Sequence, residues 1–302
     1  MYGSNHMTPP IVIFYESEAC NMKKTDIYPC QPENTQENLL AYPLCSGNPT
    51  SASVSDTVSD LDTLLDPYLN LTDGDKLLYY TWVIHQRLSA RTPIPRVVYD
   101  NLPILILTGP KGCGKSLLAK ITKGIFVTDE WISAGLEDIP IQDIEKLMTA
   151  TTVLTYDDIP TIPDQYSTML ADLAETGFHD GQGFILNGTD LTIPDNLYDY
   201  VIQLKLQPLT KPVPEDELLL SIGSRLDDIR EAFCNLCDAV IMTMIHEQLF
   251  GAQDYNDQPQ PVRKLDYLYN YLEIGRAYSI LSHGDKTIVP QLVATTQLRQ
   301  NQ

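Results

Sequence analysis

Positively charged residues are scarce in this sequence of 302 residues. It contains 20 lysines and arginines against 40 aspartates and glutamates, which gives a formal net charge of −20 at pH 7. A protein that grips nucleic acid usually carries a basic surface, because phosphate contacts dominate the affinity. We therefore expect any contact with nucleic acid to be local, weak or made through a partner. Solubility, or adaptation to a salty medium, explains the same acidic excess without nucleic acid.

Long apolar runs are also absent. No apolar run reaches the length of about 18 residues that indicates a membrane-spanning helix, so no membrane span is expected. The first residues lack a basic segment followed by an apolar one, which argues against a secretory signal. Because 43% of the residues are apolar, the chain can build a sizeable core, and we expect one main domain with appended pieces.

The pattern of residues divides the chain into four regions. They are an irregular N-terminal arm (1–57), a helical N-terminal region (58–96), an α/β core (97–211) and a helical C-terminal region (212–302). The arm is rich in Pro, Ser, Thr and Asn and has little hydrophobic periodicity, which is typical of irregular or partner-dependent segments.

Amphipathic periodicity predicts helices on both sides of the core. They lie near 58–70, 74–90, 215–250 and 264–282. The second of them is expected to bury Leu77, Leu78, Trp82, Val83 and Ile84. Cys234 and Cys237 have the spacing of metal ligands, but no second pair lies near them, so a packed helix is expected there.

Short β-rich runs alternate with helical stretches in the core. The expected strands are Ile104–Leu107, Ile125–Val127, Val153–Tyr156, Phe184–Leu186 and Val201–Leu206, and the expected helices lie near 115–123, 141–149 and 165–176. Strands that alternate with helices form βαβ units and a mostly parallel sheet. The predicted fold class is therefore α/β, a parallel sheet flanked by helices.

The first strand runs into the sequence Gly-Pro-Lys-Gly-Cys-Gly-Lys-Ser at 109–116, and a helix-forming stretch follows. This is the P-loop pattern in its proper context, which argues against a chance glycine-rich turn. Its backbone N–H groups and the helix N-terminus favour a bound phosphate. Lys115 is expected to reach the β- and γ-phosphates and Ser116 to ligate Mg²⁺. The predicted ATP-binding residues are Gly109, Pro110, Lys111, Gly112, Cys113, Gly114, Lys115, Ser116 and Leu117.

Polar residues also end the next two strands of the core. Asp157 and Asp158 follow Val153–Tyr156, at the sheet edge where ligands bind in parallel α/β folds. Asp157 is expected to hold Mg²⁺ and Asp158 to polarise the attacking water, although an acidic turn is the alternative. Asn187 follows the next strand and is placed to contact the γ-phosphate and orient the water. Asn before Gly is also a common turn device.

In order, GPKGCGKS, VLTYDD and FILNG resemble the AAA+ class of P-loop ATPases. The resemblance is greatest to the superfamily 3 helicase-like ATPases of phages, viruses, plasmids and integrated elements, and it covers about residues 100–240. It implies Walker A roles for Lys115 and Ser116, Walker B roles for Asp157 and Asp158, and a sensor 1 role for Asn187. It also implies a homo-oligomer, with a ring as one arrangement, that acts in replication or mobilisation of a mobile genetic element.

The chain departs from that family in its arginines. Relatives usually carry an arginine finger after the sensor strand, where this chain has Tyr200, and no arginine occurs between Arg96 and Arg225. Fast hydrolysis by the chain alone is therefore not expected, and a partner can be required to supply the arginine. Arg225 and Arg230, at the start of the long C-terminal helix, are candidate substitutes. Solvated helix charges are an equally good interpretation of both residues.

Two other functions compete with that of a helicase-like ATPase. One is a nucleotide-dependent scaffold or binding protein with little or no intrinsic hydrolysis. The other is a small-molecule P-loop kinase, which needs arginines around the transferred phosphoryl group, so the arginine-free stretch 97–224 argues against it. A protein that uses ATP is expected in the cytoplasm, with its six cysteines as reduced thiols.

Overall fold

The computed structural model describes residues 54–90, 103–126, 153–176, 183–209, 214–247 and 268–300. All of the described elements belong to one unit, Ala52–Gln302. The expected irregular arm lies outside the described residues, except that helix α1 (Val54–Leu65) begins within its last few positions. The helix expected near 141–149 also lies outside them.

The described strands form an all-parallel sheet in the order β2-β3-β1-β4. Their bounds are β1 (Ile104–Thr108), β2 (Val153–Tyr156), β3 (Gly183–Gly188) and β4 (Val201–Lys205). Every residue of β1, β2 and β3 is buried. Continuously buried apolar strands are typical of a parallel sheet that helices cover on both faces. The predicted α/β class with a parallel sheet is therefore confirmed.

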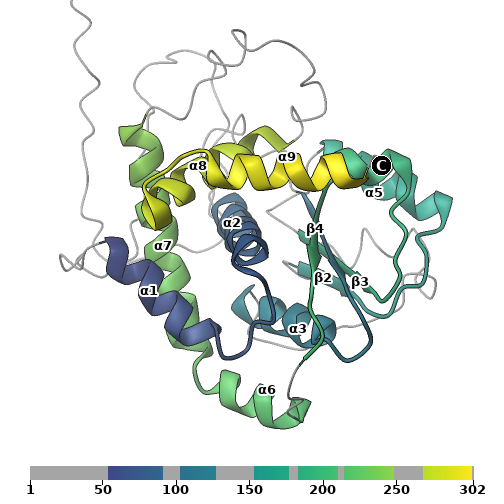
Figure 1. Cartoon of the computed structure of the whole chain (residues 1–302), viewed down its shortest axis with the longest axis horizontal. Coiled ribbons are helices and arrows are strands. Elements are labelled where there is room, and N and C mark those ends of the chain that lie inside the picture. The colour runs from purple at the N-terminus through teal and green to yellow at the C-terminus, as the bar shows by residue number, and fades with distance from the viewer. Residues whose placement is uncertain are drawn as a thin grey trace, which may run out of the picture. The chain divides into compact units, whose positions relative to one another are not determined.

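Helices α3 (Lys115–Phe126) and α5 (Asp164–Thr176) lie on opposite sides of this sheet (Figure 1). Tyr166 and Leu170 of α5 belong to a buried cluster with Phe184 and Leu186 of β3. The short helix η3 (Asp195–Tyr200) adds Leu197 to the same cluster. Burial of each such side chain contributes about 1.5–3 kcal/mol, so the cluster fixes α5 against the sheet.

Helix α2 (Asp73–Ala90) is the most enclosed helix of the N-terminal region. It begins with a capping interaction in which Thr72 Oγ1 accepts a hydrogen bond from the backbone N–H of Asp75 at 3.1 Å. The five apolar side chains expected to be buried are buried. The opposite side of the helix is buried as well, including Tyr79, Tyr80 and His85, because α2 also contacts the C-terminal helices.

The C-terminal part of the unit is helical. It consists of α6 (Glu215–Gly223), α7 (Leu226–His246), α8 (Tyr269–His283) and α9 (Ile288–Gln300). Helices α7, α8 and α9 all contact α2. Together with α2 they form a helical layer (Figure 1).

Three sequence expectations about these elements are wrong. Ile125 is not in a strand, because α3 continues to Phe126 and buries the β-branched side chain. The single helix expected at 215–250 is broken between Gly223 and Leu226, and glycine and serine at 223–224 are weak helix formers. Helix α9 follows the predicted last helix after Gly284, whose left-handed conformation (φ 70°) ends α8.

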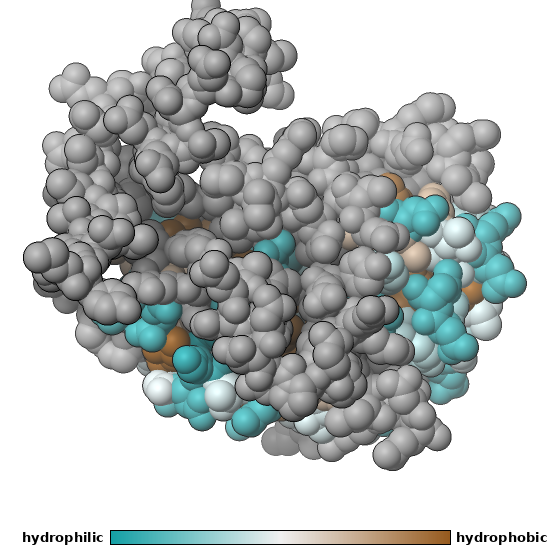
Figure 2. All heavy atoms as spheres, turned by 90° about the horizontal axis from the view of Figure 1, so that it is seen from above, coloured by the Kyte–Doolittle hydropathy of each residue, from teal (hydrophilic) through white to brown (hydrophobic). Residues whose placement is uncertain are grey.

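Within the part of the chain that the structure describes, no helix combines the length and the apolar character needed to cross a membrane. Figure 2 shows that the visible described surface is largely hydrophilic, with hydrophobic colour limited to small areas.

Candidate functional site

The loop between β1 and α3, which we call the phosphate-type loop after its sequence pattern, has a tight backbone that depends on its glycines. Gly109, Gly112 and Gly114 have φ values of 144°, 76° and 96°, which side chains other than hydrogen rarely allow. A Cβ atom at Gly109 would lie 2.5 Å from the Leu206 carbonyl oxygen and 2.9 Å from Cys113 Sγ. Nothing lies within 4 Å of a Cβ atom built on Gly112 or Gly114. The loop is therefore closed against the end of β4 and open on its outer side.

Lys115 begins α3 and folds its side chain back over this loop. Its Nζ donates hydrogen bonds to the carbonyl oxygens of Gly109 (2.9 Å) and Pro110 (3.1 Å), and it lies 3.9 Å from Cys113 Sγ. The residue is 8% exposed. The ammonium thus contacts neutral groups among the described residues, at a helix N-terminus. No carboxylate among these partners compensates the positive charge, so it can attract an anion.

Ser116 and Asp157 meet next to the loop, although they come from α3 and from the end of β2. Ser116 Oγ donates a hydrogen bond to Asp157 Oδ1 at 2.9 Å. Both residues are half-buried. A hydroxyl and a carboxylate are hard oxygen donors of the kind that Mg²⁺ prefers, so this pair can supply two protein ligands for the ion.

Asp158 turns the chain sharply after β2. With φ 54°, it is the one non-glycine residue with positive φ in the described parts of the chain. Its backbone N–H donates to Asp157 Oδ1 (2.9 Å) and to Asn187 Oδ1 (3.0 Å). Aspartate tolerates this conformation better than most residues. The turn leaves the Asp158 side chain exposed at the edge of the sheet.

Asn187 is 1% exposed and lies beside these acids at the end of β3. Its Oδ1 accepts the Asp158 N–H, so its Nδ2 must point elsewhere, and Nδ2 has no hydrogen-bond partner within the described residues. Gly188 follows it, where a Cβ atom would lie 2.2 Å from the Ile159 carbonyl oxygen. The glycine thus lets the chain after β2 lie directly against β3.

The register of the sheet explains why these residues converge. Leu107 of β1 pairs with Asn187 of β3, and Tyr156 of β2 pairs with Leu186. The carboxyl ends of all three strands therefore reach one edge of the sheet, where polar ligands bind in parallel α/β folds. The structure brings together the predicted loop 109–117, Asp157, Asp158 and Asn187.

The structure does not bring Arg230 to this edge. Its guanidinium donates to the Gly124 carbonyl oxygen through Nε (3.1 Å) and Nη2 (2.7 Å), and to Asp227 Oδ1. Gly124 lies nine residues beyond Lys115, about 13 Å along the axis of α3. Arg230 is therefore engaged at the far end of the helix from the loop.

Arg225 and Tyr200 lie in other parts of the fold. Arg225 is exposed and lies in the chain between Gly223 and Leu226, which line a cavity together with Gly124 of α3. Tyr200 is half-buried and packs against the cluster between α5, η3 and the sheet.

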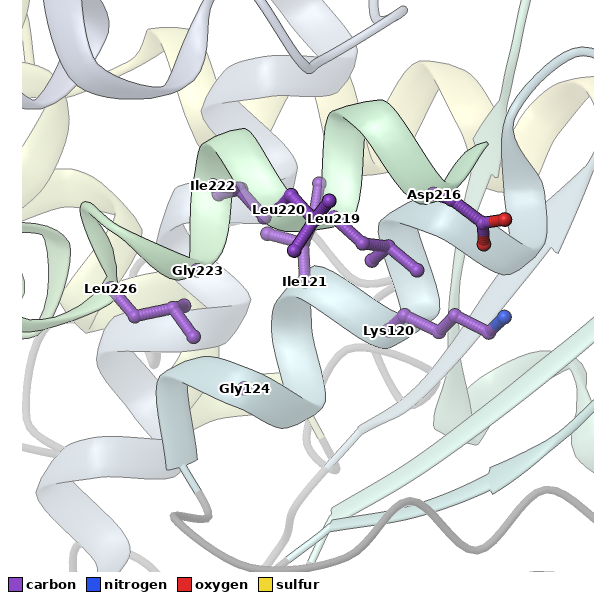
Figure 3. Close-up of a pocket in the computed structure, with 9 residues that line it drawn as sticks. All are labelled: Lys120, Ile121, Gly124, Asp216, Leu219, Leu220, Ile222, Gly223 and Leu226. Atoms are coloured by element: carbon purple, nitrogen blue, oxygen red, sulfur yellow. The ribbon is translucent and has the colours of Figure 1, made fainter. Parts of the chain in front are cut away.

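The cavity next to Arg225 is separate from the candidate site. It has a volume of about 540 Å³ and lies between α3 and α6, as Figure 3 shows. Its lining is mainly apolar, with Lys120 and Asp216 pointing toward the same end. None of residues 109–117 lines it. Leu220, on its rim, is 79% exposed.

One residue outside the predicted set reaches the phosphate-type loop. Asn70, between α1 and α2, donates a hydrogen bond from Nδ2 to the Cys113 carbonyl oxygen at 3.2 Å. The sequence carries no signal for this contact, because Asn70 belongs to no motif and lies 43 positions before Cys113.

No family model matches this chain, and no curated protein matches it. Among solved structures it is similar to the SCCmec type IV Cch active helicase, with a TM-score of 0.40 and 11% identity. The likeness covers 85% of this chain and 53% of that chain, so this chain spans about half the length of the helicase structure. A likeness of this size fixes neither family nor activity, and the chemistry of the site must be judged from its own residues.

Proposed function

We propose that this chain binds ATP together with Mg²⁺ at the loop between β1 and α3, and that it hydrolyses the bound ATP. The observation that carries the proposal is the 2.9 Å contact between Ser116 Oγ and Asp157 Oδ1, beside a glycine loop whose lysine is folded over it. Two hard oxygen donors and one ammonium converge at a helix N-terminus, which is an arrangement suited to a magnesium-bound phosphate chain.

Two further observations, independent of the contact between Ser116 and Asp157, support a bound phosphate at this site. The buried Nδ2 of Asn187 lacks a partner within the described residues, and such an orphaned donor costs about 1–3 kcal/mol until an acceptor arrives. A phosphate oxygen or a bound water is an acceptor of the required kind. The open outer side of the loop at Gly112 and Gly114 leaves room for a phosphate.

In this proposal, Ser116 and Asp157 hold the ion. Mg²⁺, when bound, would neutralise charge on the phosphates. Lys115 would exchange its carbonyl partners for phosphate oxygens. Asp158 would orient a water molecule and accept its proton, because its carboxylate is exposed while its backbone is fixed by two hydrogen bonds. Asn187 would hold that water or the terminal phosphate through Nδ2.

We also propose that the chain works as a helicase-like ATPase in replication or mobilisation of a mobile element. The order of the motifs in the sequence supports this, as does the family resemblance that they carry. A homo-oligomer, with a ring as one arrangement, belongs to the same proposal. The net charge of −20 favours nucleic-acid contacts that are local or made by a partner.

The tyrosine at position 200 and the contacts of Arg230 favour slow hydrolysis by the isolated chain. An arginine finger raises the rate of phosphoryl transfer by about 10³–10⁵, but the expected position holds Tyr200, and Arg230 is engaged at the far end of α3. A nucleotide-dependent scaffold is therefore the second candidate function.

Turnover of ATP by the purified chain tests the two functions. We expect slow, Mg²⁺-dependent phosphate release, which single-stranded DNA or a partner that carries an arginine accelerates. ATP binding without phosphate release, with and without DNA, would replace the ATPase by the scaffold. Absence of both binding and release would remove the proposal altogether.

A further inference from the structure

The chain between α1 and α2 contacts three parts of the molecule that are distant in sequence. Asn70 Nδ2 donates to the carbonyl oxygen of Cys113 at 3.2 Å and also to the carbonyl oxygen of Gln207, after β4. The hydroxyl of Tyr68 lies 2.7 Å from Ser221 Oγ of α6. We call residues 66–72 the strap, because they connect the phosphate-type loop to the segment after β4 and to α6.

Asn70 acts at a point where the loop is already pressed against the end of β4. The Leu206 carbonyl oxygen leaves no room for a side chain at Gly109, and the Leu206 N–H donates to the Thr108 carbonyl oxygen at 2.8 Å. Asn70 joins the next residue, Gln207, to Cys113 on the same loop. The loop is therefore held at its start by β4 and at its end by the strap.

The Cys113 carbonyl controls the orientation of a group that the proposed function needs. A peptide unit is planar and trans, so the Cys113 C=O and the Gly114 N–H point in opposite directions. When Asn70 holds the carbonyl on one side, the Gly114 N–H must face the other side. In loops of this type, backbone N–H groups are the donors that surround a phosphate.

The chemistry of asparagine suits this task. One amide nitrogen carries two N–H groups and can serve two carbonyl oxygens at once. Asn70 is half-buried, so its amide competes with water for the two carbonyls and its loss does not open a cavity in the core. Its effect should therefore fall on the loop rather than on the fold.

We propose that Asn70 is a positioning residue for the phosphate loop: it fixes the Cys113–Gly114 peptide with the Gly114 N–H turned toward the triphosphate. This inference rests on the proposed function, since it assigns a support to the same site. It adds a residue from outside every motif of the sequence.

The test uses the full chain, titrated calorimetrically with MgATP and with inorganic tripolyphosphate in Mg²⁺. Asn70→Leu keeps a similar shape but has no donor, and Asn70→Ala removes only half-buried atoms. The expected result is that both ligands bind about tenfold more weakly, which corresponds to the loss of about one hydrogen bond. The factor should be the same for both ligands because only the phosphate loop is altered.

Tyr68→Phe is the matched control, because it removes a hydrogen bond of the same strap that leads to α6 and not to the loop. Its affinities should equal those of the wild type. Thermal melting of each variant establishes that it is folded, and if Asn70→Leu is not, Asn70→Ala decides.

Unchanged affinity for both ligands in a folded Asn70 variant would overturn the inference. So would a loss for MgATP without a loss for tripolyphosphate, since the residue would then act on the base or sugar. Equal weakening by Tyr68→Phe would overturn it too, because the whole strap would be responsible. A wild-type chain that binds neither ligand would instead refute the proposed function, and this outcome is visible before any variant is made.

Discussion

Asn187 and Asp157 each accept hydrogen bonds from the protein through one side-chain oxygen, Oδ1. The other polar atom of each side chain can bind a ligand. Asn187 Oδ1 accepts the Asp158 N–H, while Nδ2 is buried without a partner in the described residues. Asp157 Oδ1 accepts from both Ser116 Oγ and the Asp158 N–H. These hydrogen bonds fix the orientation of the groups before a ligand arrives, so little ordering entropy remains to be lost on binding.

Replacement of Asp158 by asparagine separates binding from hydrolysis. Asparagine has the same shape and tolerates positive φ, so the turn and its two backbone hydrogen bonds should persist. We expect MgATP affinity close to that of the wild type, while turnover falls by about 10²–10⁴-fold, the usual contribution of a general base. Calorimetry and a phosphate-release assay measure the two quantities.

Asp157→Asn is the comparison for this variant, because it changes a proposed ligand of the ion. It should weaken the dependence of ATP binding on Mg²⁺. If turnover were unchanged in Asp158→Asn, the residue would have no role as a base, and the scaffold function would be favoured.

Helix α3 is anchored at one end and open to a ligand at the other. Near its C-terminus, Arg87 of α2 donates to the Ile125 carbonyl oxygen at 3.1 Å, and Arg230 of α7 donates to that of Gly124. Cations stabilise the negative end of a helix. These contacts explain why Arg230 is not engaged at the loop. The N-terminus of α3, where Lys115 lies, can therefore interact with an anion.

Helix α2 contains a titratable group that makes stability depend on pH. His85 is fully buried beside Tyr271, and burial lowers its pKa to about 3. The unfolded state, with a pKa near 6.5, binds the proton more readily than the folded state. Stability is therefore greatest above that value and falls as the pH decreases from about 6.5 toward 3, by up to about 1.4 kcal/mol per pH unit.

Denaturant unfolding at several values between about pH 7.5 and about pH 5 measures the free energy of unfolding of the wild type and of His85→Phe. The phenyl ring has a similar shape and does not titrate, so the variant should lose less stability on acidification than the wild type. Identical pH dependence in the two proteins would show that His85 is not the group responsible.

Elements whose signals are local in sequence could be predicted, and those that depend on distant contacts could not. The strand, loop and helix around Gly109 and Lys115 follow one another directly, so pattern alone locates them. The short apolar run at Ile125 has no such context, and in the structure α3 continues through Ile125 to Phe126 and buries its side chain. Asn70 has no local signal, because its partners are 43 and 137 positions away.

At the scale of the whole molecule, the described chain is an α/β unit in which one edge of a parallel sheet collects the polar groups. The strap that precedes α2 connects this helix to the phosphate-type loop. The net charge of −20 would repel a phosphate from much of the surface. Under the proposed function, binding of a triphosphate would therefore depend on the local charge of Lys115, the dipole of α3 and an ion held by Ser116 and Asp157.

Titration of MgATP into the wild type and into Lys115→Ala tests this central claim most directly. The substitution removes the ammonium that is folded over the loop, where it donates hydrogen bonds to the carbonyls of Gly109 and Pro110. We predict that the wild type binds MgATP, and that Lys115→Ala retains the melting temperature of a folded protein but shows no binding at the same concentrations. Equal affinity in the two proteins would contradict the account, because the loop would then not be the phosphate site.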